Sequence, residues 1–88
     1  MKYVVIDGKE IESIEDVYNL MAEELAFPDY FGYNLDALFD CLTEYGEPVQ
    51  MEIRNKEDLD SALEEDQEVF YSVILRAAEE NPNIYLEF

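Results

Sequence analysis

Three short segments rich in β-branched and aromatic residues stand far apart in this chain, and their spacing most constrains its fold. They cover residues 3–6, residues 49–53, where apolar and polar side chains alternate, and residues 84–88. Both stretches between them are too long for a hairpin and carry helical periodicity, which is typical of crossovers between parallel strands.

The first crossover predicts two helices. Ser13 stands where a helix cap is expected, and the apolar residues after it recur every three to four positions: Ile14, Val17, Tyr18, Met21 and Leu25. We expect Phe27-Pro28 to end this helix, because the residue before a proline avoids the helical region. Asn34 can cap a second helix, whose apolar face would hold Leu35, Leu38, Phe39 and Leu42.

The second crossover also predicts two helices. Asn55 would cap a short helix that carries Leu59, Ala62 and Leu63, residues 69–77 carry a wider apolar face, and Asn81-Pro82-Asn83 breaks the pattern. The predicted order is β-α-α-β-α-α-β. It defines an α/β fold in which a three-stranded parallel sheet packs against four helices, within a single domain of residues 1–88.

The charge of the chain limits its partners. Asp and Glu number 23 against 5 Lys and Arg, which gives a formal net charge of −18, and no basic residue lies between Glu10 and Ile53. Such a chain repels nucleic acids and anionic membranes, so we expect neither as a partner. Because the excess charge also destabilises the compact state, a function that uses the field is one explanation and a salt-adapted or acidic cytoplasm is another. We expect a cytoplasmic protein, since the N-terminus lacks the apolar run of a signal peptide and no segment is long enough to span a membrane.

Residues that usually carry chemistry are scarce. The chain has no histidine, one cysteine and three glycines, none of them in a phosphate-binding pattern, so we expect no enzyme activity, cofactor or metal site. A carrier or metal-buffering role remains an alternative. Ser61 stands in a sequence close to an acyl-carrier attachment site but inside a predicted helix, and the acidic run 58–68 lacks the glycine of a calcium loop. Cys41 is expected to be a buried structural thiol.

The segment 28–43 is the most informative part of the chain. At about 100° per residue, one face of the second helix, next to its apolar face, carries Asp36, Asp40, Thr43 and Glu44. The loop before this helix is unusually rich in aromatic residues: Tyr30, Phe31 and Tyr33. Acids flanked by tyrosines are typical of protein interfaces. A solvated helix whose loop aromatics fill the core explains the same residues equally well.

The segment Leu25-Ala26-Phe27-Pro28-Asp29-Tyr30-Phe31-Gly32-Tyr33-Asn34-Leu35-Asp36-Ala37-Leu38-Phe39-Asp40-Cys41-Leu42-Thr43 resembles the signature of the barstar family, intracellular inhibitors of barnase-type ribonucleases. Weaker similarity extends along the chain, through Ile6-Asp7-Gly8 with Ile11, the helix start at Ser13 and the closing strand. The resemblance implies a three-stranded parallel sheet with four helices. It also implies that the second helix and its preceding loop enter the ribonuclease active site, with acids in place of RNA phosphates.

The resemblance also implies roles for individual residues. Asp40 would be the main anchor, with Asp36 beside it and Tyr30 packed at the edge. The same surface would include Gly32, Asn34, Leu35, Phe39 and Thr43. The implied partner is a basic, extracellular-type, barnase-like ribonuclease, bound by a monomer. A barstar-like domain that neutralises a different basic protein or toxin is the alternative.

Several positions depart from the family pattern. Phe39 stands where the best-known member has tryptophan, and Tyr33 replaces an acid in the loop. Arg76 falls near the place of an expected interface acid, and neither Glu79 nor Glu80 is assigned to that role. A second cysteine near the C-terminus is missing. These departures bear on which nuclease or toxin is bound.

Overall fold

The computed structural model describes all 88 residues and contains one three-stranded sheet. Its strands are β1 (Lys2–Asp7), β2 (Val49–Arg54) and β3 (Ile84–Glu87). Both neighbouring pairs are parallel, in the order β1-β2-β3, so that Val4 lies opposite Met51 and Met51 opposite Leu86. The predicted α/β fold around three parallel strands is confirmed.

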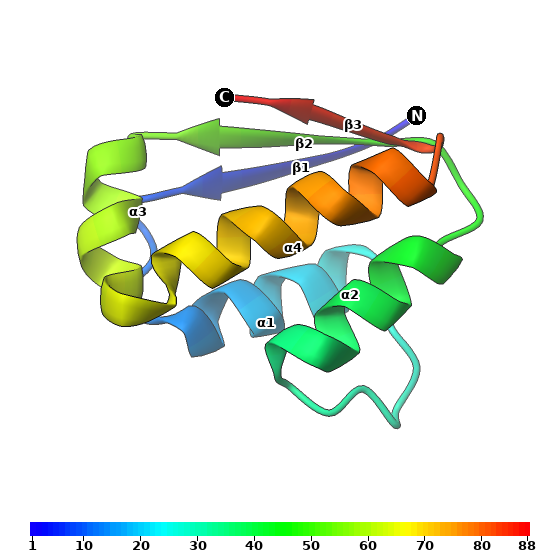
Figure 1. The fold of residues 1–88 in the computed structure, drawn as a ribbon, viewed down its shortest axis with the longest axis horizontal. Helices are drawn as coiled ribbons and strands as arrows, with labels where there is room; N and C mark the ends of the chain where they lie inside the picture. The colour runs from blue at the N-terminus through cyan, green and yellow to red at the C-terminus, as the bar shows by residue number, and fades with distance from the viewer.

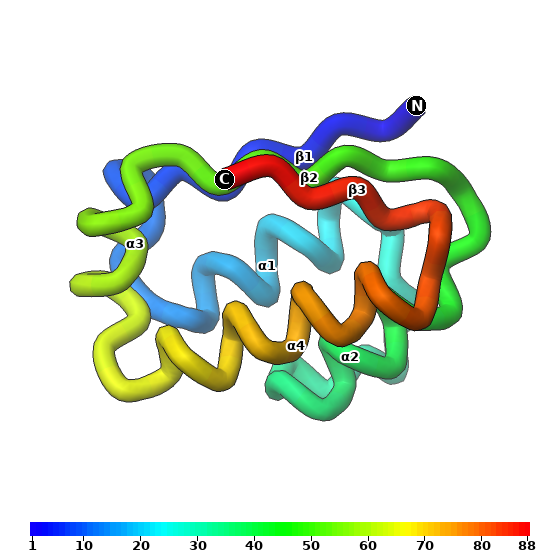
Figure 2. The backbone as a smooth tube through the Cα atoms, turned by 45° about the horizontal axis from the view of Figure 1, so that its top comes forward, coloured from blue at the N-terminus to red at the C-terminus, as the bar shows by residue number.

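The helices lie in the two crossovers, α1 (Ile14–Glu24) and α2 (Leu35–Glu44) in the first, and α3 (Lys56–Leu63), the 3-10 turn η1 (Glu64–Asp66) and α4 (Gln67–Glu80) in the second. In Figure 1, α1, α2 and α4 lie on one side of the sheet, and α3 lies beyond the ends of β1 and β2. Figure 2 shows that α1 and α4 lie nearer the sheet than α2, which packs against α4. The helix that carries the predicted acids is therefore the outermost of the three. None of the helices is long and apolar enough to cross a membrane.

The core lies between the inner face of the sheet and the helices. Its largest fully buried side chains come from the sheet and from all four helices: Val4, Ile6, Val49, Met51, Val17, Met21, Leu38, Leu42, Leu59, Leu63, Phe70 and Ile74. In β2 the odd positions Val49, Met51 and Ile53 are buried while Gln50 and Glu52 are half-buried. The predicted period-two strand with one buried face is thus confirmed.

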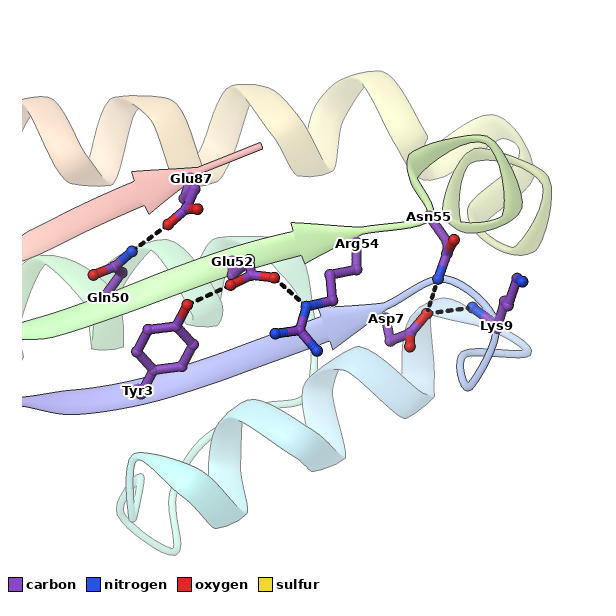
Figure 3. A network of polar contacts seen from close by, with 8 residues as sticks. All are labelled: Tyr3, Asp7, Lys9, Gln50, Glu52, Arg54, Asn55 and Glu87. Atoms are coloured by element: carbon purple, nitrogen blue, oxygen red, sulfur yellow. Dashed lines mark hydrogen bonds and ion pairs between the residues drawn. The ribbon is translucent and has the colours of Figure 1, made fainter.

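The outer face of the sheet is covered by polar contacts instead of helices. Figure 3 shows the Tyr3 hydroxyl donating to Glu52, which also forms an ion pair with Arg54, and Gln50 donating to Glu87. Parallel sheets are usually covered on both faces. These pairs satisfy the side chains of a parallel sheet that leaves one face to water.

Two predicted helix caps, Ser13 before α1 and Asn55 before α3, are confirmed in position but make no side-chain capping hydrogen bond. The amide of Asn55 instead donates to the Asp7 carboxylate (2.7 Å), which lowers the pKa of Asp7 (Figure 3). Before α1, the Asp16 carboxylate accepts from the Glu12 backbone N–H at 2.8 Å. At α3 the Asn55 side chain thus pairs with a distant residue instead of capping the helix, and at α1 the hydrogen bond at the helix start is made by Asp16 and not by Ser13.

Gly8 is required by the packing of β1 against α3. A Cβ atom at this position would lie 2.3 Å from the Asn55 carbonyl oxygen and 2.3 Å from the Leu59 nitrogen, both backbone atoms. The absence of a Cβ atom at Gly8 therefore allows the start of α3 to pack against the end of β1.

The end of α1 differs from the expectation based on Phe27-Pro28. The helix ends at Glu24, Ala26 adopts a left-handed backbone (φ 52°), and the Phe27 N–H donates to the Ala22 carbonyl oxygen at 3.0 Å. This geometry is that of a Schellman cap, in which glycine is the preferred residue at the left-handed position. Alanine carries a steric cost there.

Ala26→Gly is therefore expected to raise the free energy of unfolding by about 1 kcal/mol, measured by urea titration. Ala22→Gly, inside α1 where the backbone is right-handed, provides the matched control and should lower it by about 1 kcal/mol. Equal losses in both variants would show that Ala26 is not strained.

Candidate protein-binding surface

The start of α2 is set by Asn34. Its side-chain oxygen accepts from the Ala37 N–H (2.8 Å), and its side-chain nitrogen donates to the Gly32 carbonyl oxygen (3.2 Å). A Cβ at Gly32 would approach that nitrogen to 3.0 Å, so glycine gives the amide its room. The predicted cap is confirmed, and it ties the loop before α2 to the helix.

Three acids run along the exposed side of α2: Asp36, Asp40 and Glu44, one turn apart. We call these residues the acidic face. The two ion pairs of the protein, Arg54–Glu52 and Lys56–Asp60, lie elsewhere, so no basic side chain neutralises the acidic face. Like charges four residues apart destabilise a helix by about 0.2–0.5 kcal/mol per pair. The acidic face is thus a feature that the isolated helix would not favour.

Thr43 lies beside the acidic face and is half-buried. Its hydroxyl donates to the Asp40 carbonyl oxygen at 3.0 Å. The hydroxyl hydrogen of Thr43 is therefore engaged within α2.

The aromatic residues of the loop divide into two kinds. Phe31 is buried, with its ring centroid 5.0 Å from that of Phe27 and 6.2 Å from that of Tyr18. Tyr30 is 83% exposed and Tyr33 is 51% exposed. The core-filling interpretation therefore holds for Phe31, whereas Tyr30 presents its side chain to solvent next to α2.

Leu35 and Phe39 are half-buried and pack against the core. The guanidinium of Arg76, on α4, lies over the Phe39 ring, 5.2 Å from its centroid. Phe39 is thus partly covered on the α4 side. This contact joins two elements that are far apart in sequence, and sequence reasoning did not anticipate it.

A shallow hollow of about 310 Å³ lies between the loop and the second half of α2, lined in part by Pro28, Tyr30, Cys41 and Glu44. Cys41 is half-buried, which corrects the expectation of a fully buried thiol. Burial raises the pKa of Cys41, with smaller contributions from the charges of Glu44 and Asp40. A thiol with a raised pKa is a poor nucleophile, in keeping with a structural role.

Asn81 fixes the end of α2 and was missed as a site-positioning residue. It is the one buried polar side chain, and its amide donates to the carbonyl oxygens of Leu42 (2.8 Å) and Tyr45 (2.9 Å). Its oxygen accepts from the Asn83 N–H at 3.0 Å. Asn81 therefore links the turn after α4 to the last turn of α2. The sequence indicated only a helix-ending Asn-Pro pair here.

Ser61 and the acidic run 58–68 were the other candidate sites. Ser61 is exposed within α3, as expected from its position in the sequence. No group of three or more metal-ligating side chains converges anywhere in the chain.

The fold and this surface define a small α/β protein in which one outer helix and its preceding loop display unpaired acids and an exposed tyrosine. The chain belongs to the barstar family, because the family model described as Barstar (barnase inhibitor) matches residues 1–87. The protein named "Putative ribonuclease inhibitor YrdF" of Bacillus subtilis (strain 168) is 38% identical over 81 residues, covering 91% of this chain and 89% of the relative. The resemblance to barstars is confirmed, and the family is one of inhibitors, not of enzymes.

Proposed function

We propose that this protein inhibits a basic, barnase-type ribonuclease by covering the enzyme's active site with the acidic face of α2 and the loop before it. The observation that carries the proposal is the pair of exposed, unpaired carboxylates of Asp36 and Asp40 beside the exposed ring of Tyr30, in a member of the barstar family. Because a ribonuclease active site must attract a polyanion, carboxylates can take the place of RNA phosphates there.

The residues of the surface contribute in different ways. Asp40 is the main anchor and Asp36 supports it, while Tyr30 packs its ring at the edge of the contact. Gly32, Leu35 and Phe39 offer backbone and apolar surface around them. The side chains of Asn34 and Thr43 already make internal hydrogen bonds, so they contribute mainly by fixing the shape of the surface.

The charge of the whole chain supports rapid binding. A net charge of −18 steers a basic partner toward the protein, and complementary fields raise association rates to about 10⁸–10⁹ M⁻¹s⁻¹ at low salt, a range known from this same family of complexes. The same charge disfavours self-association, so residues 1–88 act as one monomeric domain. We place it in the cytoplasm, where an inhibitor would protect RNA from a ribonuclease before its secretion.

A different basic protein or toxin is a second candidate partner. The observation that favours it is Tyr33, which is 51% exposed in the loop before α2 and replaces an acid of the family pattern. Tight binding to such a protein without loss of ribonuclease activity would support this alternative.

A titration tests the proposal. The purified protein is added to barnase-type ribonucleases while cleavage of RNA is followed. Stoichiometric inhibition of at least one enzyme is expected. Full activity of every enzyme at micromolar protein would reject the ribonuclease as partner.

Salt is expected to act in opposite directions on binding and on stability. Raising the ionic strength from about 0.01 M to 0.15 M shortens the Debye length from about 30 Å to 8 Å. Inhibition should become slower and weaker, while the free protein should unfold at a higher temperature because its acids repel one another less. Stopped-flow binding and thermal unfolding in the same buffers measure both, and parallel changes would contradict the electrostatic account.

A further inference from the structure

Arg76 is an unusual residue in its surroundings. The chain has 5 basic residues against 23 acids, and of the two arginines Arg54 is ion-paired with Glu52. Arg76 is exposed on α4, has no carboxylate within ion-pair distance and makes no hydrogen bond. Its one specific contact is with the ring of Phe39, 5.2 Å from the guanidinium carbon. Arg76 thus contacts an aromatic ring, although the chain contains many carboxylates that could pair with it.

This contact holds the guanidinium in a binding-ready state. An arginine over an aromatic face is attracted by the ring, and the planar fork of N–H donors of Arg76 makes no hydrogen bond within the protein. That fork matches the two oxygens of a carboxylate. The side chain has therefore lost part of its conformational freedom before any partner arrives, while its donors stay unused.

The position of Arg76 borders the acidic face. Phe39 directly precedes Asp40 in α2, and Cys41 directly follows it, so the two flank Asp40 by about 100° on opposite sides of the helix. The Phe39 side carries Arg76, and the Cys41 side leads to the hollow beside Tyr30. A partner that covers Asp40 and also extends over Phe39 thus reaches the guanidinium at the rim of the contact.

From this arrangement we infer that Arg76 is a specificity residue, which binds a carboxylate that the ribonuclease carries next to its cationic active site. The inference rests on the proposed function and adds the chemistry of the partner. A ribonuclease with a cation at that position would face Arg76 with a like charge and be disfavoured. The competing explanation is that Arg76 only relieves repulsion from Glu79 and Glu80, which follow it by one turn on α4.

Charge reversal distinguishes the two explanations by the sign of its effect. The probe is the barnase-type ribonuclease that the unmodified protein inhibits most strongly among those titrated. Arg76→Glu makes the inhibitor more acidic, so a purely global attraction predicts tighter binding to a basic enzyme. Our inference predicts at least tenfold weaker inhibition. Arg76→Met, which keeps an apolar stem over Phe39 without the charge, should weaken inhibition less than Arg76→Glu does.

Lys9→Glu is the matched control. Lys9 is exposed, its side chain forms no ion pair, and the substitution changes the net charge by the same two units. It should leave inhibition unchanged or slightly stronger. Thermal unfolding of each variant confirms that the protein is folded. Arg76→Glu that inhibits as well as Lys9→Glu, or better, would overturn the inference.

A second substitution, made in the ribonuclease, locates the carboxylate. Among single replacements of its surface acids by lysine, one is expected to restore inhibition by Arg76→Glu, and failure of all of them would also overturn the inference. Failure of the proposed function gives a different result, namely no inhibition by the unmodified protein, and that would overturn both.

Discussion

Asp40→Ala is expected to weaken inhibition of the ribonuclease by roughly 30- to 4,000-fold. Removing one partner of a buried, hydrogen-bonded charge pair costs about 2–5 kcal/mol, a range drawn in part from complexes of this same family, and each 1.4 kcal/mol is a factor of ten. The loss is large because the cationic groups of the enzyme would be covered by the inhibitor and left without a partner. The inhibition constant of the purified variant measures it.

The same substitution should not lower the folding stability of the free protein. Asp40 lies between Asp36 and Glu44 on α2, and the alanine removes both like-charge contacts. Alanine also has a higher helix propensity than aspartate. Urea unfolding of Asp40→Ala should therefore show unchanged or slightly greater stability, which separates the loss of binding from any loss of folding.

Glu65→Ala is the matched control for Asp40→Ala. Glu65 is exposed in η1, and its removal changes the net charge by the same amount. It should alter inhibition by less than a factor of about three, since exposed charges outside an interface act only through the screened field. Equal small effects of the two substitutions would reject Asp40 as the anchor.

Asn81→Ala is expected to lower the free energy of unfolding by about 1–3 kcal/mol. The substitution removes the amide that donates to the carbonyl oxygens of Leu42 and Tyr45, and a buried polar group left unpaired costs about 1–3 kcal/mol. The Leu42 oxygen keeps a contact with the Tyr45 N–H at 3.3 Å, so the loss falls mainly on Tyr45. Since small domains have only about 5–15 kcal/mol of stability, urea titration will detect this change readily.

Two further variants test the geometry at Asn81. Asn81→Asp keeps the size of the side chain but turns an acceptor toward the two carbonyl oxygens, so it should destabilise the protein more than Asn81→Ala does. Asn83→Ala is the control, because its side chain approaches the Tyr45 oxygen only at 3.5 Å, and it should cost less than about 1 kcal/mol. Equal losses for Asn81→Ala and Asn83→Ala would show that Asn81 does not anchor α2.

The sheet and α2 follow from patterns that act locally. The alternation of apolar and polar residues at 49–53 predicts the alternating burial of β2. The start of α2 is predicted by Asn34, and its inner face by the spacing of Leu35, Leu38 and Leu42. The helical crossovers then require parallel strands. These features could be predicted because each depends on a repeating apolar period or on a cap within three residues.

The remaining features depend on contacts between distant parts of the chain. The Asn55 side chain binds Asp7 instead of capping α3, and Asn81 reaches across to α2 from the turn after α4. Arg76 meets Phe39 only because α4 packs against α2. No local pattern carries such information, since asparagine and arginine can satisfy their donors in many ways. For Tyr30 and Phe31, adjacent aromatics with opposite exposure, the sequence left both outcomes open.

The central claim is that the surface around Asp40 occupies the place of RNA in the ribonuclease. The most direct measurement is the apparent inhibition constant of the protein at increasing concentrations of RNA substrate. The account predicts competitive behaviour, in which the apparent constant rises linearly with RNA concentration and the maximal rate is unchanged. An apparent constant that does not depend on RNA concentration, or an inhibitor that binds equally well to the RNA-saturated enzyme, would contradict it.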